Sequence, residues 1–129
     1  MMRVLLDTHA FLWWNTDDPK LSQTARDVIA DGHNEVFLSV VSAWEIAIKA
    51  ARGSLLLPEL PGHYVPDRMR LHHFLALPIQ LSHALHVFDL PEIHRDPFDR
   101  ILIAQSQLES LPILTTDPEI ARYDVAIIW

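Results

Sequence analysis

One stretch near the N-terminus decides the fold: RVLLDTHAFLWW, residues 3–14. Its first part, RVLL (3–6), is a short apolar run that ends at an acid, Asp7, and such a run is typical of a buried β-strand. The residues from Thr8 to Trp14 then show the pattern of a short helix, with Asp7 or Thr8 near its cap. A buried strand that leads into a helix is the repeating unit of a parallel sheet.

The same alternation continues along the chain. Further strands are predicted at 36–38, 74–79, 112–116 and 125–129, and helices at 22–31, 41–52, 81–88 and 98–108, with a helical turn at 118–122. The proline-rich segment 55–68 is expected to be a helix-poor connection or a clip, and 68–72 to be helical. Strands that alternate with helices predict a mainly parallel sheet with helices on both faces, an α/β fold. A length of 129 residues predicts a single domain, 1–129.

Composition excludes several classes of function. The chain has no cysteine, so thiol catalysis and disulfides are absent, and a cytoplasmic location is expected. The three glycines are far apart, so there is no glycine-rich phosphate loop. The net charge of −7 argues against nucleic-acid binding through bulk electrostatics. Neither a signal peptide nor a membrane span is expected, because the first apolar run is broken at Asp7 and His9.

Four acids occupy comparable places in this alternation. Asp7 and Asp117 follow predicted strands, Glu45 lies in the helix after the second strand, and Asp99 opens a long helix. In an open parallel sheet, ligands bind at the carboxyl ends of the strands, so at least three of these acids should meet at that edge. Converging carboxylates repel one another unless a cation lies between them. Hard oxygen ligands favour magnesium or manganese, which can hold a phosphate oxygen and activate a water.

Each acid also has a simpler structural interpretation. Asp7 can cap the helix that follows it, and Asp117 precedes a proline as helix-capping aspartates often do. The segment from Ser42 to Glu45 fits a capping box, in which Glu45 would reach back to a backbone amide. Caps, however, have no need to gather at one edge of one sheet, and the joint pattern therefore favours a metal pocket.

The segment HRDPFDR, 94–100, combines both roles. Asp96 and Pro97 have the signature of a helix start, with the aspartate as N-cap and the proline in the first position. That start places Asp99 on the first turn, at the positive end of the helix dipole, where we expect it to face Asp7. Asp96 is then at most a helper of the pocket.

Four segments cover nearly the whole chain in order: VLLDTHAFLWW, SVVSAWEIAIKAARG, HRDPFDRILIAQS and ILTTDPEIARYDV. Together they resemble the PIN-domain family, and more narrowly its VapC-type toxins from bacterial toxin–antitoxin pairs. The resemblance implies an α/β/α sandwich and a metal-dependent ribonuclease. It implies a cognate antitoxin that blocks the pocket, an RNA substrate and commonly a homodimer. The implied acidic pocket is Asp7, Glu45, Asp99 and Asp117, and small hydroxyls near such pockets fall here at Thr8, Ser39 and Thr115.

Within that pocket, Asp7 and Asp99 are expected to hold the principal magnesium or manganese ion, directly or through water. Glu45 and Asp117 would complete the pocket or hold a second ion. Lys49 and Arg52 share a helix face with Glu45 and could guide RNA phosphates, although Glu45 and Lys49 also form an ordinary helix ion pair. Arg100 could touch phosphate, but pairing with Asp96 or Asp99 is slightly favoured.

The remaining polar and aromatic residues carry weaker signals. The eight histidines include no His-Glu-x-x-His motif, so zinc is not favoured, and His94 stands out only by its place beside the acids. Trp13 and Trp14 are adjacent, so one of them should lie near the surface or an interface.

Three other functions fit parts of the pattern. A magnesium-binding receiver-like signalling domain needs an adjacent acidic pair and a lysine after a late strand, and neither is found here. A phosphatase with an aspartate nucleophile calls for Asp-x-Asp, where this chain has Asp7, Thr8 and His9. A catalytically inactive PIN-like binding partner is disfavoured because all four acids are present.

Overall fold

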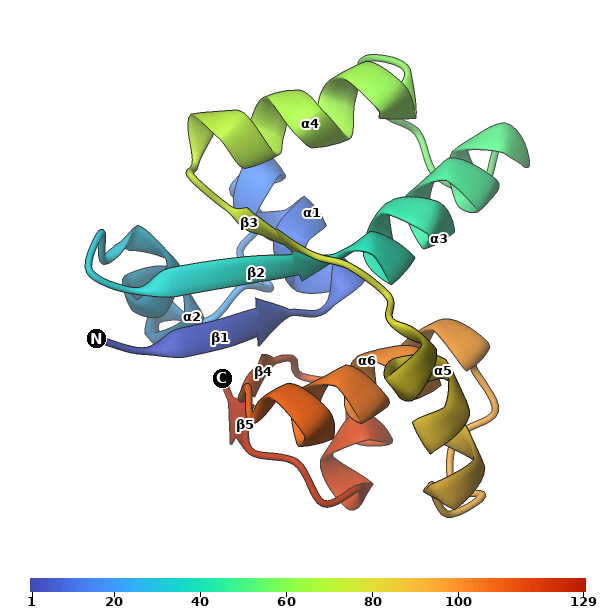
Figure 1. Cartoon of the computed structure of the whole chain (residues 1–129). Helices are drawn as coiled ribbons and strands as arrows, with labels where there is room; N and C mark the ends of the chain where they lie inside the picture. The colour runs from blue at the N-terminus through green and yellow to red at the C-terminus, as the bar shows by residue number, and fades with distance from the viewer.

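The computed structural model describes all residues from Met1 to Trp129. Its strands are β1 (Arg3–Leu6), β2 (Glu35–Ser39), β3 (Leu75–Leu77), β4 (Ile113–Leu114) and β5 (Ile127–Ile128). The α-helices are α1 (Thr8–Thr16), α2 (Gln23–Ala30), α3 (Val40–Ala51), α4 (Pro61–Leu71), α5 (Leu81–His86) and α6 (Pro97–Glu109), and the 3₁₀ turns are η1 (Val87–Asp89) and η2 (Ile120–Arg122). Figure 1 shows them with both chain termini on the same side.

The five strands form one parallel sheet in the order β3-β2-β1-β4-β5. The first strand is therefore central, with Leu6 opposite Leu38 on β2 and opposite Leu114 on β4. From β1 the chain adds β2 and β3 on one side, then crosses to β4 and β5 on the other. This reversal of strand order creates a switch point between β1 and β4, and ligands of open parallel sheets bind outside such points.

Side chains alternate along each strand, and they fill two separate cores. On β1, Val4 and Leu6 belong to the core under α1, α2 and α4, whereas Leu5 belongs to the core under α6. On β4, Leu114 and Ile113 divide in the same way. Because the side-chain period of a strand is two, apolar residues at every position require cover on both faces. The predicted α/β/α sandwich is confirmed, and Figure 1 shows its helical layers above and below the sheet.

The sequence prediction was wrong in the proline-rich segment. Instead of a helix-poor connection, much of 55–68 is helical, because α4 begins at Pro61 and contains Pro66 in its interior. Pro61 costs no hydrogen bond, since the first amides of a helix have no partner within it. Pro66 does remove one bond, but the neighbouring residues Tyr64 and Val65 are buried in the core, and this burial stabilises the helix.

The strands at the C-terminal part of the chain are shorter than predicted. The expected strand 112–116 is reduced to β4, because the chain turns at Thr115, whose Oγ1 accepts a hydrogen bond from the Asp117 amide at 3.0 Å. The expected strand 125–129 is reduced to β5. No helix in the structure combines the length and the apolar character that crossing a bilayer requires.

Candidate metal centre

The carboxyl ends of three adjacent strands bring polar side chains to one edge of the sheet. Asp7 follows β1, Ser39 ends β2, and Thr115 follows β4. All three are buried. Ser39 also caps α3, because its Oγ accepts a hydrogen bond from the Val41 amide at 3.0 Å. Each of these residues therefore lies where a strand ends and the next segment begins, and all three are buried at the carboxyl edge of the sheet.

Asp7 is both a helix cap and a buried carboxylate. One of its oxygens, Oδ1, accepts a hydrogen bond from the Ala10 amide at 2.7 Å at the start of α1. Burial raises the pKa of Asp7, while hydrogen bonds from Thr115 and Ala10 lower it less, and the charge of Asp117 raises it further. The capping interpretation is thus correct, but a cap alone needs no burial and no neighbouring acid.

Glu45 does not take part in a capping box, so that alternative is wrong. The helix α3 begins at Val40, and Glu45 lies within it as a buried residue. Its Oε1 accepts a hydrogen bond from Thr8 Oγ1 at 2.7 Å, and its Oε2 pairs with Lys49 Nζ at 2.5 Å. Thr8 has one hydroxyl proton. Because that proton goes to the carboxylate, Ser42 must be the donor in the 2.9 Å contact between the two hydroxyls.

The two aspartates of the HRDPFDR segment have different surroundings. Asp96 is the N-cap of α6, and its Oδ1 accepts from the amides of Phe98 at 2.8 Å and Asp99 at 3.2 Å. Asp99 lies on the first turn, where burial and the negative charges of Asp96 and Glu45 raise its pKa to about 7, against the opposing effect of a hydrogen bond with His94. A site that disfavours a negative charge this strongly is one that a cation would stabilise.

Asp117 divides its two carboxylate oxygens between structure and site. Oδ1 accepts a hydrogen bond from the Glu119 amide at 2.9 Å and so supports the turn into η2. Oδ2 lies 3.8 Å from His94 Nε2. The predicted helix cap is therefore wrong in detail, because η2 begins at Ile120 with Glu119 as its N-cap, and Asp117 instead stabilises the turn before it. The second oxygen is left free to face the site.

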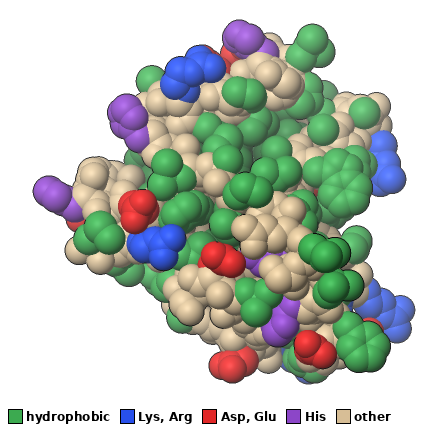
Figure 2. Space-filling model, viewed as in Figure 1, with side chains coloured by type: hydrophobic (Ala, Val, Ile, Leu, Met, Phe, Trp, Pro, Cys, Tyr) green, Lys and Arg blue, Asp and Glu red, His purple; other side chains and the backbone are tan.

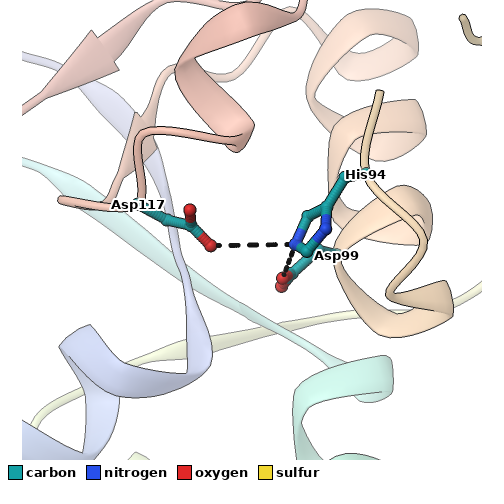
Figure 3. Close-up of side chains that lie close together, drawn as sticks. All are labelled: His94, Asp99 and Asp117. Carbon is teal, nitrogen blue, oxygen red and sulfur yellow. Dashed lines mark hydrogen bonds and ion pairs between the residues drawn. The ribbon is translucent and has the colours of Figure 1, made fainter. Parts of the chain in front are cut away.

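His94 lies between Asp99 and Asp117, in the loop before α6 (Figure 3). Its Nε2 is 2.8 Å from Asp99 Oδ2, and one ligand atom from each of the three residues lies within 4.8 Å of the others. Sequence reasoning singled out His94 by its position but gave it no role. The signal was its place two residues before the helix cap, because the chain there must pass the first turn of α6.

Arg100 is a correction to the sequence prediction. It is 9% exposed and pairs with neither Asp96 nor Asp99. Its guanidinium donates to Tyr123 Oη and to backbone carbonyls, those of Val87, Leu90, Pro91 and His94. An arginine enclosed in this way holds the segment before α6 in place and is not available to an RNA phosphate.

The other predicted contacts lie as follows. Lys49 pairs with Glu45, as the helix spacing allowed, and Arg52 is exposed at the end of α3. Trp13 and Trp14 are both partly buried against the core, and Trp13 also contacts Trp129. On the face in Figure 2 the lysine and arginine side chains are scattered and form no broad basic patch.

The donors at this edge suit a divalent cation. The donor atoms that lie within 4.8 Å of one another are two carboxylates, those of Asp99 and Asp117, and the imidazole of His94. Burial and, to a lesser extent, the neighbouring acids raise the pKa of Asp7 and of Asp99, so the protein on its own does not neutralise the cluster fully. A doubly charged ion would relieve this repulsion.

A parallel sheet with an acidic cluster outside its switch point defines a class of α/β protein with a candidate metal centre. The chain matches the model of the PIN domain over residues 4–126, and it belongs to that family. It is 40% identical over 72 residues to Ribonuclease VapC16 of Mycobacterium tuberculosis, a match that covers 53% of this chain and 51% of that protein. The match thus spans about half the length of the curated relative.

Solved structures share the fold at low sequence identity. VapBC2 from Rickettsia felis, bound to a DNA fragment from its promoter, has a TM-score of 0.72 at 10% identity and covers 98% of this chain and 97% of that one. DNA-bound VapBC from Salmonella typhimurium has a TM-score of 0.71 at 17% identity, with coverage of 98% and 97%. FitAcB from Neisseria gonorrhoeae has a TM-score of 0.64 at 20% identity, with coverage of 96% and 95%.

Proposed function

We propose that this protein is a metal-dependent endoribonuclease and the toxin of a toxin–antitoxin pair. The observation that carries the proposal is the group of ligand atoms of His94, Asp99 and Asp117, which lie within 4.8 Å of one another outside the β1–β4 switch point. Asp117 is close enough to Asp7 to raise the pKa of that carboxyl, and Glu45 is close enough to Asp99 to do the same there. A capping role alone does not explain why burial raises the pKa of Asp7, or why burial together with neighbouring acids raises that of Asp99. Support for RNA as the substrate comes from the relative named as a ribonuclease, which matches over half its length.

In this proposal Asp7 and Asp99 hold magnesium or manganese, and Glu45 and Asp117 complete the pocket. When bound, the ion supplies a Lewis acid that activates a water and stabilises the charge that develops on the phosphate oxygens. Thr8 fixes Glu45 by donating to Oε1, and Thr115 holds both the Asp117 amide and Asp7. Ser39 fixes the start of α3, which carries Glu45.

Substrate RNA would approach from the side of Lys49. The Nζ of this residue lies 2.5 Å from Glu45 Oε2, and its side chain is 40% exposed, so it can meet a phosphate without leaving the site. Arg52 lies further along the same helix. Two basic residues at the rim position a backbone without reading its sequence.

The antitoxin would occupy a groove that begins at the acids. A groove of about 340 Å³ is lined by Thr8, Glu45 and Lys49 at one end and by apolar side chains from α1, α4 and the segment 55–58. Such a groove suits an apolar segment of a partner chain, which would cover Glu45 when bound. The VapBC and FitAcB structures each contain a chain with the same fold as this protein. We propose that this chain likewise binds a cognate antitoxin. We also propose that it is a homodimer and that it acts in the cytoplasm.

The first test is cleavage of RNA by the purified chain with added manganese or magnesium, before and after Asp7→Asn. We expect the cleavage rate of the variant to fall at least a hundredfold, because the carboxylate that it lacks is one of the proposed ligands of the ion.

A second test is expression in bacteria, which should arrest growth for the unaltered chain only. Calorimetry of ion binding identifies an inactive family member, since such a protein would bind neither ion. Undiminished cleavage by Asp7→Asn would overturn the site.

A further inference from the structure

We infer that His94 is a direct nitrogen ligand of the proposed ion, and that the centre therefore prefers manganese and other first-row transition ions to magnesium. The inference rests on the proposed function and adds a fifth donor to the four acids. Its basis is the position of His94 Nε2, which lies 2.8 Å from Asp99 Oδ2 and 3.8 Å from Asp117 Oδ2 (Figure 3).

These spacings are those of ligands that share one ion. Donor atoms that each lie about 2.1 Å from a metal are separated from one another by roughly 3–4 Å. The distance of 3.8 Å from Nε2 to Asp117 falls within that range, the distance of 2.8 Å to Asp99 lies just below it, and the three donor atoms lie within 4.8 Å of one another. A histidine that only formed an ion pair with Asp99 would have no reason to direct the same nitrogen toward Asp117 as well.

The backbone holds His94 in this position from two sides. Its amide donates to Tyr123 Oη at 2.7 Å, and its carbonyl accepts from Arg100 Nη1 at 3.3 Å. Tyr123 Oη accepts in turn from Arg100 Nη1 at 3.1 Å. Tyr123 is buried, and the His94 side chain is 21% exposed. Because both ends of the residue are anchored to buried groups, the imidazole is presented to the acids with little freedom to turn away, as a metal ligand requires.

A nitrogen ligand changes which ion the centre selects. Magnesium prefers oxygen donors, whereas imidazole suits first-row transition ions, whose affinity rises from manganese to iron and cobalt. Neutral His94 presents a lone pair on Nε2 when its proton lies on the other ring nitrogen. The carboxylates alone would bind magnesium and manganese, and His94 would shift the balance toward manganese and cobalt.

The test compares the metal-free full chain with its His94→Ala and His33→Ala variants. His33 is the matched control, because its side chain is 92% exposed and contacts only Asp31. Calorimetry with manganese, cobalt and magnesium chlorides should show that His94→Ala loses tenfold or more in affinity for manganese and cobalt, and less than threefold for magnesium. Electron spin-echo spectroscopy of bound manganese should detect one imidazole nitrogen in the unaltered chain and in His33→Ala, and none in His94→Ala.

The outcomes separate this inference from the proposed function. Manganese bound without any nitrogen coupling would overturn the role of His94 while leaving the acidic pocket intact. Equal losses for magnesium and manganese in His94→Ala would overturn the preference. Failure of the unaltered chain to bind any of the three ions would overturn the proposed function as well. Thermal melts of the metal-free variants verify that each is folded.

Discussion

Asp96 and Asp99 lie three residues apart and have different surroundings, so their substitutions should differ in kind. Asp99→Asn keeps the shape but removes a charge that faces Glu45 and His94, and we expect cleavage to be abolished with the fold intact. Asp96→Ala removes a cap that serves two amides, so it should cost about 1 kcal/mol of stability and retain most activity. Cleavage rates and denaturant melts of both variants check this, and equal loss of activity would contradict the division.

At the scale of single residues, the sequence was sufficient for contacts that are local. The caps by Asp7 and Asp96 depend on amides two or three residues away, and both are present. Asp117 accepts a hydrogen bond from the amide two residues on, although it forms a turn before η2 and not a helix cap. The position of Arg100 was not predictable, because its partners Val87 and Tyr123 are brought to it by packing of other elements. The role of His94 was not predictable for the same reason, because its orientation depends on a hydrogen bond to Tyr123, which is distant in sequence.

At the scale of elements, Arg100 joins α6 to the segment that precedes it, which includes η1 and His94. Its guanidinium satisfies several buried carbonyls at once, and their loss of a partner is costly. We expect Arg100→Ala to destabilise the protein by about 3 kcal/mol. Hydrogen exchange should accelerate in residues 87–94 before it does elsewhere.

The matched control for this prediction is Arg122→Ala. Arg122 is 61% exposed and pairs only with Glu119, so its removal should change stability by less than about 0.5 kcal/mol. Similar losses from the two variants would show that the enclosed arginine contributes no more than a surface one. If Arg100→Ala lost stability but amide hydrogen exchange in residues 87–94 were no faster, Arg100 would stabilise some other part of the fold.

The elements themselves were predicted where a hydrophobic period was long or a cap was evident. The helix α6 has both, and it was predicted to within one residue at each end. The helix α4 was missed, because prolines disfavour a helix through local effects that the sequence shows. The burial of Tyr64 and Val65, which stabilises α4, depends on residues of the core that are distant in sequence. Strands β4 and β5 were overestimated, since an apolar run does not show where the chain turns.

At the scale of the whole molecule, the crowded acids should make the metal-free protein less stable as pH rises. Asp99 has an ordinary pKa of 3.8 when unfolded and about 7 when folded. Between these values the unfolded state has lost the proton and the folded state keeps it, so stability falls from about pH 4 to about pH 7. Each pKa unit between the folded and unfolded values corresponds to about 1.4 kcal/mol of stability. The total loss of stability over this pH range is on the order of a few kcal/mol.

Thermal melts across this pH range check the prediction. The metal-free Asp99→Asn variant should be more stable than the unaltered chain at pH 7.5 and show a flatter profile. Asp124→Asn serves as control, because that aspartate is exposed and its side chain is far less confined. Manganese should raise the melting temperature of the unaltered chain at pH 7.5, through binding to the folded state alone. A profile for Asp99→Asn that is identical to that of the unaltered chain would contradict the assignment.

The class of fold was predictable from the alternation of strands and helices, and the family match agrees with it. The order of strands was not, because a period along the sequence says nothing about which strands pair. Placing β1 at the centre requires β4 to cross to its free side. That pairing joins Leu6 with Leu114, more than a hundred residues apart in the chain.

This central position of β1 has a consequence for synthesis on the ribosome. The first acid of the site is made almost at once, but the strand that precedes it lacks a neighbour on one side until Ile113 and Leu114 have been made. Asp99 and Asp117 also come late. Chains of this size fold as units, and pairings between distant residues form slowly. A partly made chain therefore cannot assemble the acidic edge. Under the proposed function, the ribonuclease would stay inert until its translation is nearly complete.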